Sequence, residues 1–275
     1  MIVNLVFAAA KIVGGLIGNA YVLIADGIES ALDVAGSLII WSGLKFAARP
    51  PDETHPYGHG KAEPIAAVVV AFGVLAAALG LAIESIREIR TPHHGPAPFT
   101  LGILIVVIVV KEVLFRYVNR VGRHVQSTAV QTDAWHHRSD ALTSAAAFIG
   151  ITAALIGGQG WESADDWAAL FACGVIAANG VRLLRPALSE IMDTAPRGEI
   201  VDRVRSAARA VPGVIEIEKS FVRKMGLSFY VDLHVRVDAG MTVREGHDIA
   251  HQVKRAIQDT DGRIADVLVH IEPAG

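Results

Sequence analysis

The sequence predicts an α-helical membrane protein with six transmembrane helices, followed by a small α+β domain at the C-terminal end. Hydrophobic residues make up 52% of the 275 positions and the mean hydropathy is +0.42, which is high for a soluble protein. Residues 64–83 and 141–161 carry no charged side chain, and each run is long enough to cross about 30 Å of hydrocarbon as a helix. Charged residues number 29 in the first 193 positions and 24 in the last 82, so a water-facing part is expected to begin near residue 194.

Six apolar segments are expected to span the membrane, near residues 1–18, 20–46, 63–87, 98–118, 128–157 and 164–188. Lys and Arg gather between the second and third segments, between the fourth and fifth, and after the sixth, although Arg87 and Arg90 interrupt this pattern. By the positive-inside rule, the bias places these connections and the C-terminal end in the cytoplasm. We therefore expect a multi-pass inner (plasma) membrane protein with a membrane domain over 1–190 and a cytoplasmic domain over 194–275.

The tail is expected to contain helices and strands in the order αββαβ, at residues 197–211, 214–224, 228–238, 242–259 and 265–272. Pro212 and Gly213 end the first helix, and Gly226 marks the turn between the first two strands. Apolar residues occupy every second position of 229–237, so one face of this strand is expected to meet a core. This order is typical of a small sheet with helices on one face, as in ferredoxin-like α+β domains.

Composition and missing motifs exclude several classes of function. Cys173 is the single cysteine, which excludes a disulfide framework and a multi-cysteine metal cluster, so metal ligands must be nitrogen or oxygen atoms. A net charge of −3 offers no basic footprint for nucleic acid. The sequence lacks a phosphate-binding Gly-rich loop with Lys, a phosphorylatable Asp motif and the His-Glu-x-x-His motif of metalloproteases. A membrane metalloenzyme is thus a disfavoured alternative, and we expect no enzyme activity.

Five ionisable residues lie inside the apolar segments. Asp26, Glu29 and Asp33 share one helical face in the second segment, and His136 and Asp140 are four residues apart in the fifth. Each carboxylate at the bilayer centre costs about 2.5–3.5 kcal/mol on insertion scales, so these groups need compensation. A divalent cation supplies it, because two helices that each offer an i, i+4 pair can surround one ion tetrahedrally.

Two alternatives remain open for these residues. Lys11 and Arg138 could pair with the acids as buried salt bridges, in which case no metal is required. Asp26 lies near the start of its helix and could act there as a cap instead of a ligand. Lys11 is expected to reach the membrane interface or to neutralise an acid.

Three motifs resemble signatures of the cation diffusion facilitator family. The segment GNAYVLIADGIESALD at 18–33 is similar to the family's second-helix signature, HHRSD at 136–140 to its fifth-helix signature, and HPYGHGKAE at 55–63 to the loop before its third helix. The similarity covers essentially the whole chain and is greatest to the bacterial YiiP-like (FieF-type) branch, whose members are homodimeric zinc or iron–proton antiporters. Glu29 departs from that branch, where Asp or His is usual, and its extra methylene and the harder set of oxygen ligands leave the choice of metal open.

The resemblance implies a transport site inside the membrane, formed by Glu29, Asp33, His136 and Asp140. It implies a second site in the loop before the third helix, formed by Asp52, His55 and His59. For these three residues the alternative is an ordinary solvated loop.

The resemblance also implies metal binding at a dimer interface in the cytoplasm, by His234, His247, His270 and Glu272. The alternative there is a set of scattered surface histidines. Lys61 and Asp193 match an ion pair of the family where helix ends meet the tail.

These observations predict a secondary transporter that exports divalent metal ions. Zn²⁺ is the expected main substrate and regulatory or structural ion, with Fe²⁺, Mn²⁺, Co²⁺ and Cd²⁺ as further candidates. Export against an inside-negative potential costs about 4.6 kcal/mol per 100 mV for a divalent ion, and protons that enter are the expected drive. His136 binds metal only when neutral, so protons and metal compete for it. The expected partners are metal ions, protons, membrane lipids and a second copy of the chain. A passive divalent-metal channel and a metal-sensing membrane protein remain alternatives.

Overall fold

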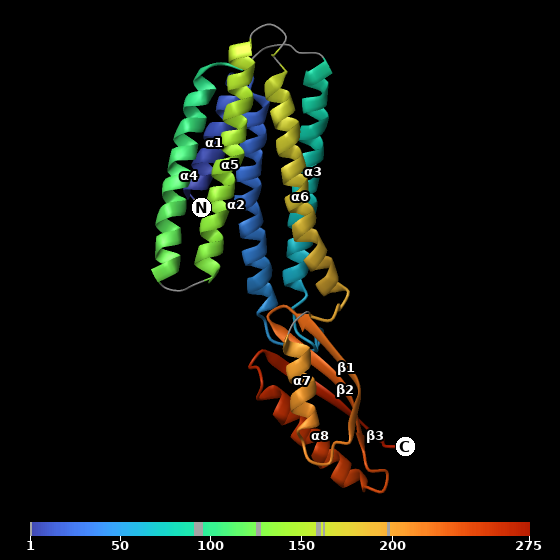
Figure 1. Cartoon of the computed structure of the whole chain (residues 1–275). Helices are drawn as coiled ribbons and strands as arrows, with labels where there is room; N and C mark the ends of the chain where they lie inside the picture. Colours follow the sequence, from blue (N-terminus) through green and yellow to red (C-terminus); the bar gives the residue numbers. More distant parts are fainter. Residues whose placement is uncertain (1, 91–95, 125–127, 158–160, 162, 197–198) are drawn as a thin grey trace. The chain divides into compact units, whose positions relative to one another are not determined.

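The computed structural model describes residues 2–90, 96–124, 128–157, 161, 163–196 and 199–275, with side chains described except at 2–3, 121–137 and 139 (Figure 1). Six helices come first: α1 (Ile2–Ile17), α2 (Tyr21–Ala47), α3 (Ala62–Arg90), α4 (Phe99–His124), α5 (Thr128–Gly157) and α6 (Ala164–Ile191). The tail follows with α7 (Glu199–Arg209), β1 (Glu216–Met225), β2 (Ser228–Val237), α8 (Val243–Gln258) and β3 (Ile264–Pro273). The predicted fold class, six helices followed by an αββαβ domain, is confirmed.

One helix is longer than its apolar segment. We expected the fourth helix to end near residue 118, but α4 continues to His124. Arg120, which follows the expected segment, therefore lies on the last turns of α4. Arginine is a good helix former, so charge alone does not end a helix that leaves the hydrocarbon.

Several of the described helices are long and apolar enough to cross a membrane. They are α3, the Asp140–Gly157 part of α5, and α6, while Asn4–Ile17 of α1 forms a shorter apolar helix. The helices α2 and α4 have similar lengths, 27 and 26 residues, but more charged residues interrupt them. These interruptions include the residues that the sequence singled out in α2.

The chain forms two compact units. The first comprises residues 1–39 and 69–184, and the second comprises 40–68 and 185–275. The C-terminal end of α2, the following loop, the start of α3 and the end of α6 therefore belong to the same unit as the tail. The domains expected from sequence, 1–190 and 194–275, are each one continuous segment, whereas the contacts place residues 40–68 with the tail.

Small residues allow close helix packing in the first unit. A Cβ atom on Gly27 of α2 would lie 2.7 Å from Ile12 Cγ1 of α1, and one on Gly150 of α5 would lie 2.4 Å from Ala168 Cβ of α6. Both distances are too short for a side chain, so these glycines let the backbones approach. A buried cluster combines Ala20, which precedes α2, with residues of α2, α4, α5 and α6: Val22, Leu23, Leu104, Ala147, Ile151 and Ala169.

The tail contains a three-stranded sheet in the order β1-β2-β3. β1 and β2 are antiparallel around Gly226, whose φ of 63° suits glycine, and β2 and β3 are parallel. The odd-numbered residues of β2 from 229 to 237 are buried together with apolar residues of α7 and α8. The even-numbered side chains of β2 therefore lie on the open face of the sheet.

Candidate metal sites

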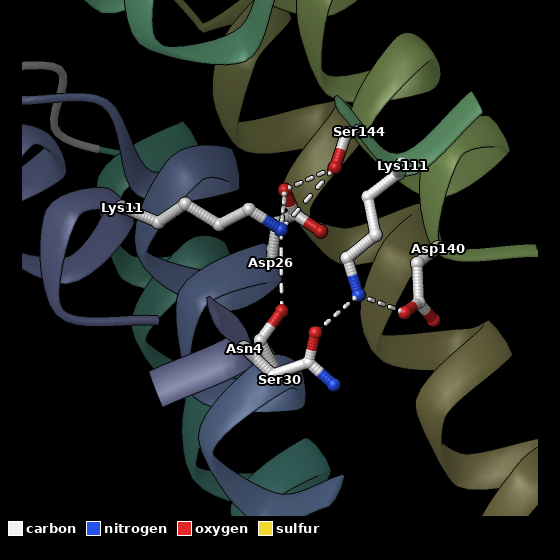
Figure 2. A network of polar contacts seen from close by, with 7 residues as sticks. All are labelled: Asn4, Lys11, Asp26, Ser30, Lys111, Asp140 and Ser144. Carbon is white, nitrogen blue, oxygen red and sulfur yellow. Dashed lines mark hydrogen bonds and ion pairs between the residues drawn. The ribbon is translucent and has the colours of Figure 1, made fainter. Parts of the chain in front are cut away.

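Asp26 is held in a buried network that joins α1, α2 and α5 (Figure 2). Lys11 Nζ lies 2.8 Å from Asp26 Oδ2, and the Ser144 hydroxyl donates a hydrogen bond of 2.7 Å to the same oxygen. Lys11, which is 0% exposed, also donates to the Ser30 and Ser144 hydroxyls at 3.2 and 3.3 Å. Lys11 thus neutralises an acid, one of the two roles expected for it, and Asp26 is bound to protein partners.

Asp140 also has a cationic partner. Lys111 Nζ of α4 lies 2.5 Å from Asp140 Oδ2 and donates a hydrogen bond of 3.1 Å to Asn4 Oδ1 (Figure 2). The Lys111 side chain is 1% exposed and that of Asp140 is 11% exposed. The sequence offered Lys11 and Arg138 as possible partners, whereas Arg138 extends over the Phe115 ring, 4.8 Å from its centroid. Lys111 follows directly on an apolar run, and its spacing along the chain gives no sign of a pairing with Asp140.

The remaining residues of the expected transport site lie on the same helices. Glu29 and Asp33 are half-buried on α2, and Glu29 is within electrostatic range of Asp33, Asp26 and Asp140. His136 belongs to α5, but its side chain lies outside the described residues. Among the side chains that are described, Glu29, Asp33 and Asp140 do not bring three ligand atoms within 4.8 Å of one another. The three carboxylates are therefore neighbours, but their oxygen atoms do not surround a single metal position.

The loop between α2 and α3 brings three predicted ligands together. One ligand atom from each of Asp52, His55 and His59 lies within 4.8 Å of the others. Asp52 Oδ1 is 3.2 Å from His55 Nδ1, and Asp52 Oδ2 is 3.4 Å from His59 Nε2. The Thr54 hydroxyl donates to Asp52, as does the backbone N–H of His55, and these bonds lower the pKa of Asp52 to about 2. The carboxylate is thus oriented and charged at neutral pH, as metal binding requires.

This loop is fixed to the tail within the second unit. The Tyr230 hydroxyl donates a hydrogen bond of 3.1 Å to the Tyr57 carbonyl. Lys61 Nζ lies 2.5 Å from Asp193 Oδ1 and also donates to the carbonyls of Glu190 and Ile191 at 2.9 and 3.3 Å. Lys61 therefore satisfies carbonyls at the C-terminal end of α6, in addition to making the expected ion pair.

The open face of the sheet holds a second group of possible ligands. His234 of β2 is paired in register with His270 of β3, and their ring centroids are 5.0 Å apart. Glu272 Oε1 lies 2.6 Å from His234 Nδ1 and 3.6 Å from His270 Nε2. Hydrogen bonds lower the pKa of Glu272, and the bond with Glu218 has a larger effect than the bond with His234. Glu218 of β1, which is not among the residues predicted from sequence, adds a carboxylate beside this group.

His247 does not join this group within one chain. It lies on α8, where its Nε2 atom is 3.1 Å from Nε2 of His251. α8 covers the buried face of the sheet, whereas His234 and His270 lie on the open face. His247 and His270 both line one surface depression beside β3, which neither His234 nor Glu272 lines. The expected four-residue site is therefore incomplete in a single chain.

Comparison with known proteins covers both parts of the chain. Residues 1–192 match the cation efflux transmembrane domain, and residues 196–274 match the cation efflux protein cytoplasmic domain. The manganese efflux system protein MneP of Bacillus subtilis is 30% identical over 99% of this chain and 93% of its own length. Magnetosome protein MamB of Magnetospira sp. is 31% identical over 98% of this chain and 92% of its own. A solved MamM CTD structure is 28% identical, with a TM-score of 0.27, and covers 28% of this chain and 93% of its own.

Proposed function

The chain belongs to the cation diffusion facilitator (cation efflux) family of metal transporters, and on this premise we propose that it exports Zn²⁺ or a similar divalent ion in exchange for protons. It is a multi-pass membrane protein with a cytoplasmic dimerisation domain and not an enzyme. We assign transport to residues 1–190 and dimerisation to 194–275, and place the chain in the inner (plasma) membrane, surrounded by lipids.

The acids of α2 and α5 carry this proposal. Glu29, Asp33 and Asp140 are partly buried neighbours in the helical unit, and carboxylates at membrane depth are costly unless cations compensate them. His136 of α5, four residues before Asp140, is the proposed fourth ligand. A divalent ion bound by these four residues would carry the compensating charge through the membrane.

Proton exchange follows from the chemistry of the ligands. Moving a divalent ion out against an inside-negative potential costs about 4.6 kcal/mol per 100 mV, twice the value for a single charge. An imidazole or a carboxylate binds metal only after it loses its proton, so the same groups can carry protons inward after the metal has left. Alternating access of this one site to the two sides of the membrane would couple the two fluxes.

Mn²⁺ is a second candidate substrate. A site of one histidine and three carboxylates offers harder ligands than a histidine-rich site, and hard oxygen ligands suit Mn²⁺. The name of MneP, a similar protein, refers to manganese efflux. Zn²⁺ remains the first candidate because mixed histidine and carboxylate ligands suit it at four-coordinate sites.

A single substitution should test whether Glu29 sets the preference between Zn²⁺ and Mn²⁺. We expect Glu29→His to shift preference from Mn²⁺ toward Zn²⁺, because it replaces a hard oxygen ligand by imidazole nitrogen. Uptake of labelled Zn²⁺ into vesicles containing the protein, in competition with Mn²⁺, measures the ranking. The matched control is Glu84→His on α3, which changes an exposed acid in the same way. An unchanged ranking in Glu29→His would remove Glu29 from the site, and no uptake of any divalent ion by the wild type would contradict the proposed function.

We also propose two regulatory or structural metal sites on the cytoplasmic side. The first is the loop group Asp52, His55 and His59. The second is His234, His270 and Glu272, completed by His247 when two chains associate. Their support is the short distances between ligand atoms and the depressed pKa values of Asp52 and Glu272.

A further inference from the structure

We propose that Lys111 is a tethered competitor of the metal: its ammonium group occupies Asp140 in the metal-free protein and must leave Asp140 before that carboxylate can ligate the transported ion. Lys111 thereby sets the affinity of the transport site. This inference rests on the proposed role of Asp140 as a ligand.

The contact between Lys111 and Asp140 is direct and buried. Their charged atoms are 2.5 Å apart, and both side chains are almost fully shielded from solvent. α4 and α5 run side by side, so the pair lies between two packed helices (Figure 1). A lysine whose ammonium reached solvent would be screened by water, but this one has its charge compensated by the carboxylate.

A metal ion and this ammonium cannot both hold Asp140 in the same way. A ligating carboxylate oxygen lies about 2.0–2.2 Å from Zn²⁺. An ammonium 2.5 Å from Oδ2 would then stand beside a divalent charge, which repels it. The ion therefore binds in exchange for the Lys111 contact, and the apparent affinity is lower by the strength of that contact.

Asn4 offers the displaced ammonium a second partner. Its Oδ1 atom already accepts a hydrogen bond of 3.1 Å from Lys111 Nζ (Figure 2). The lysine side chain has four flexible methylene groups, so a small rotation can give up Asp140 while the bond to Asn4 is kept. An amide oxygen carries no net charge, so Lys111 returns to Asp140 once the metal has left.

Lys11 provides an internal comparison. It is equally buried, but its ammonium contacts Asp26, Ser30 and Ser144 and not Asp140 (Figure 2). It also lies within electrostatic range of Glu29. Removing Lys11 therefore measures the effect of losing one positive charge near the site, whereas removing Lys111 also takes away the ammonium group that contacts the proposed ligand Asp140.

The test is the half-saturating metal concentration, KM, for Zn²⁺ uptake into vesicles containing the full-length protein. Lys111→Met should lower KM by about tenfold, which corresponds to the loss of a competing contact of about 1.4 kcal/mol. Its kcat should fall, because a tighter site releases the ion more slowly. Lys11→Met should lower KM by clearly less than Lys111→Met does. Equal effects of the two variants, or an unchanged or higher KM in Lys111→Met, would overturn the proposal.

A second variant covers the case in which Lys111→Met does not insert into the membrane. Asn4→Ala keeps both charges and removes the second partner, so its KM should rise. An unchanged or lower KM in Asn4→Ala contradicts the exchange mechanism. Asp33→Ala serves as the reference for the transport site itself. If Asp33→Ala transports normally, the proposed site is wrong; if it is inactive while Lys111→Met and Asn4→Ala match the wild type, the role of Lys111 alone is wrong.

Discussion

Replacing Asp33 by alanine is expected to abolish metal uptake while the protein still inserts into the membrane and dimerises. Asp33 is half-buried on α2, one turn after Glu29, and we assign it as a ligand of the transported ion. Losing one of four ligands removes both a bond to the metal and part of the compensating negative charge. Uptake of Zn²⁺ and Mn²⁺ into vesicles is the measurement, and Glu84→Ala on the exposed face of α3 is the control.

Asp140→Ala should be equally inactive, but its interpretation is less direct. It would leave Lys111 buried without its carboxylate, and breaking a buried pair typically costs about 3–5 kcal/mol of stability. A loss of activity in this variant could therefore reflect a loss of folded protein. Asp33→Ala avoids that ambiguity, and metal uptake at the wild-type rate by this variant would remove Asp33 from the transport site.

The second large effect is expected in the tail. A piece comprising 194–275 should fold alone, because its buried core is formed entirely by residues between Ile200 and Val267. It should bind Zn²⁺ through His234, His270 and Glu272, and the dimer should tighten on binding because the metal offsets carboxylate charge. His234→Ala with His270→Ala should weaken binding by at least about 10–100-fold, since even changes beside ligands have that effect. Isothermal titration measures the affinity.

The pH dependence of this binding has a defined sign. Histidine ligates metal only when neutral, and ordinary histidines gain a proton as the pH falls through about 6.5. The pKa of Glu272 is lowered, so its carboxylate stays charged well below that pH. Zn²⁺ affinity of the tail should therefore weaken as the pH is lowered, because protons compete with the metal for imidazole nitrogen. Binding by the double variant as tight as that of the parent would leave the tail as a dimerisation module without a metal site.

Local pattern was enough to predict much of the architecture. The apolar runs gave the six helices, and the alternation over 229–237 gave the buried and open faces of β2. The loop group could be expected because Asp52, His55 and His59 are close along the chain and prolines prevent a helix there. His234, His270 and Glu272 share a face because strand periodicity is two and parallel pairing brings β2 beside β3.

Contacts between distant elements could not be predicted in this way. Lys111 contacts Asp140 because α4 packs on α5 in one particular rotation. Helical periodicity shows which residues share a face of a helix, but it does not show which helix packs against that face. His247 is separated from His234 because α8 covers the opposite side of the sheet, a choice that depends on the handedness of the β2–α8–β3 crossover. The contact of Lys111 depends on three-dimensional packing and leaves no spacing signal in the sequence, whereas the position of His247 follows from the expected arrangement of the helices on one face of the sheet.

We propose that metal export is coupled to proton entry through one site inside the membrane. Purified protein in vesicles with an acidic lumen should accumulate Zn²⁺ or Mn²⁺ above the outside concentration, because protons that leave the lumen drive the metal in. Collapsing the pH gradient with an ionophore should abolish this accumulation, and Asp33→Ala should show none with the gradient present. Metal that merely equilibrates across the membrane, at the same rate with and without the gradient, would contradict antiport and indicate a passive channel.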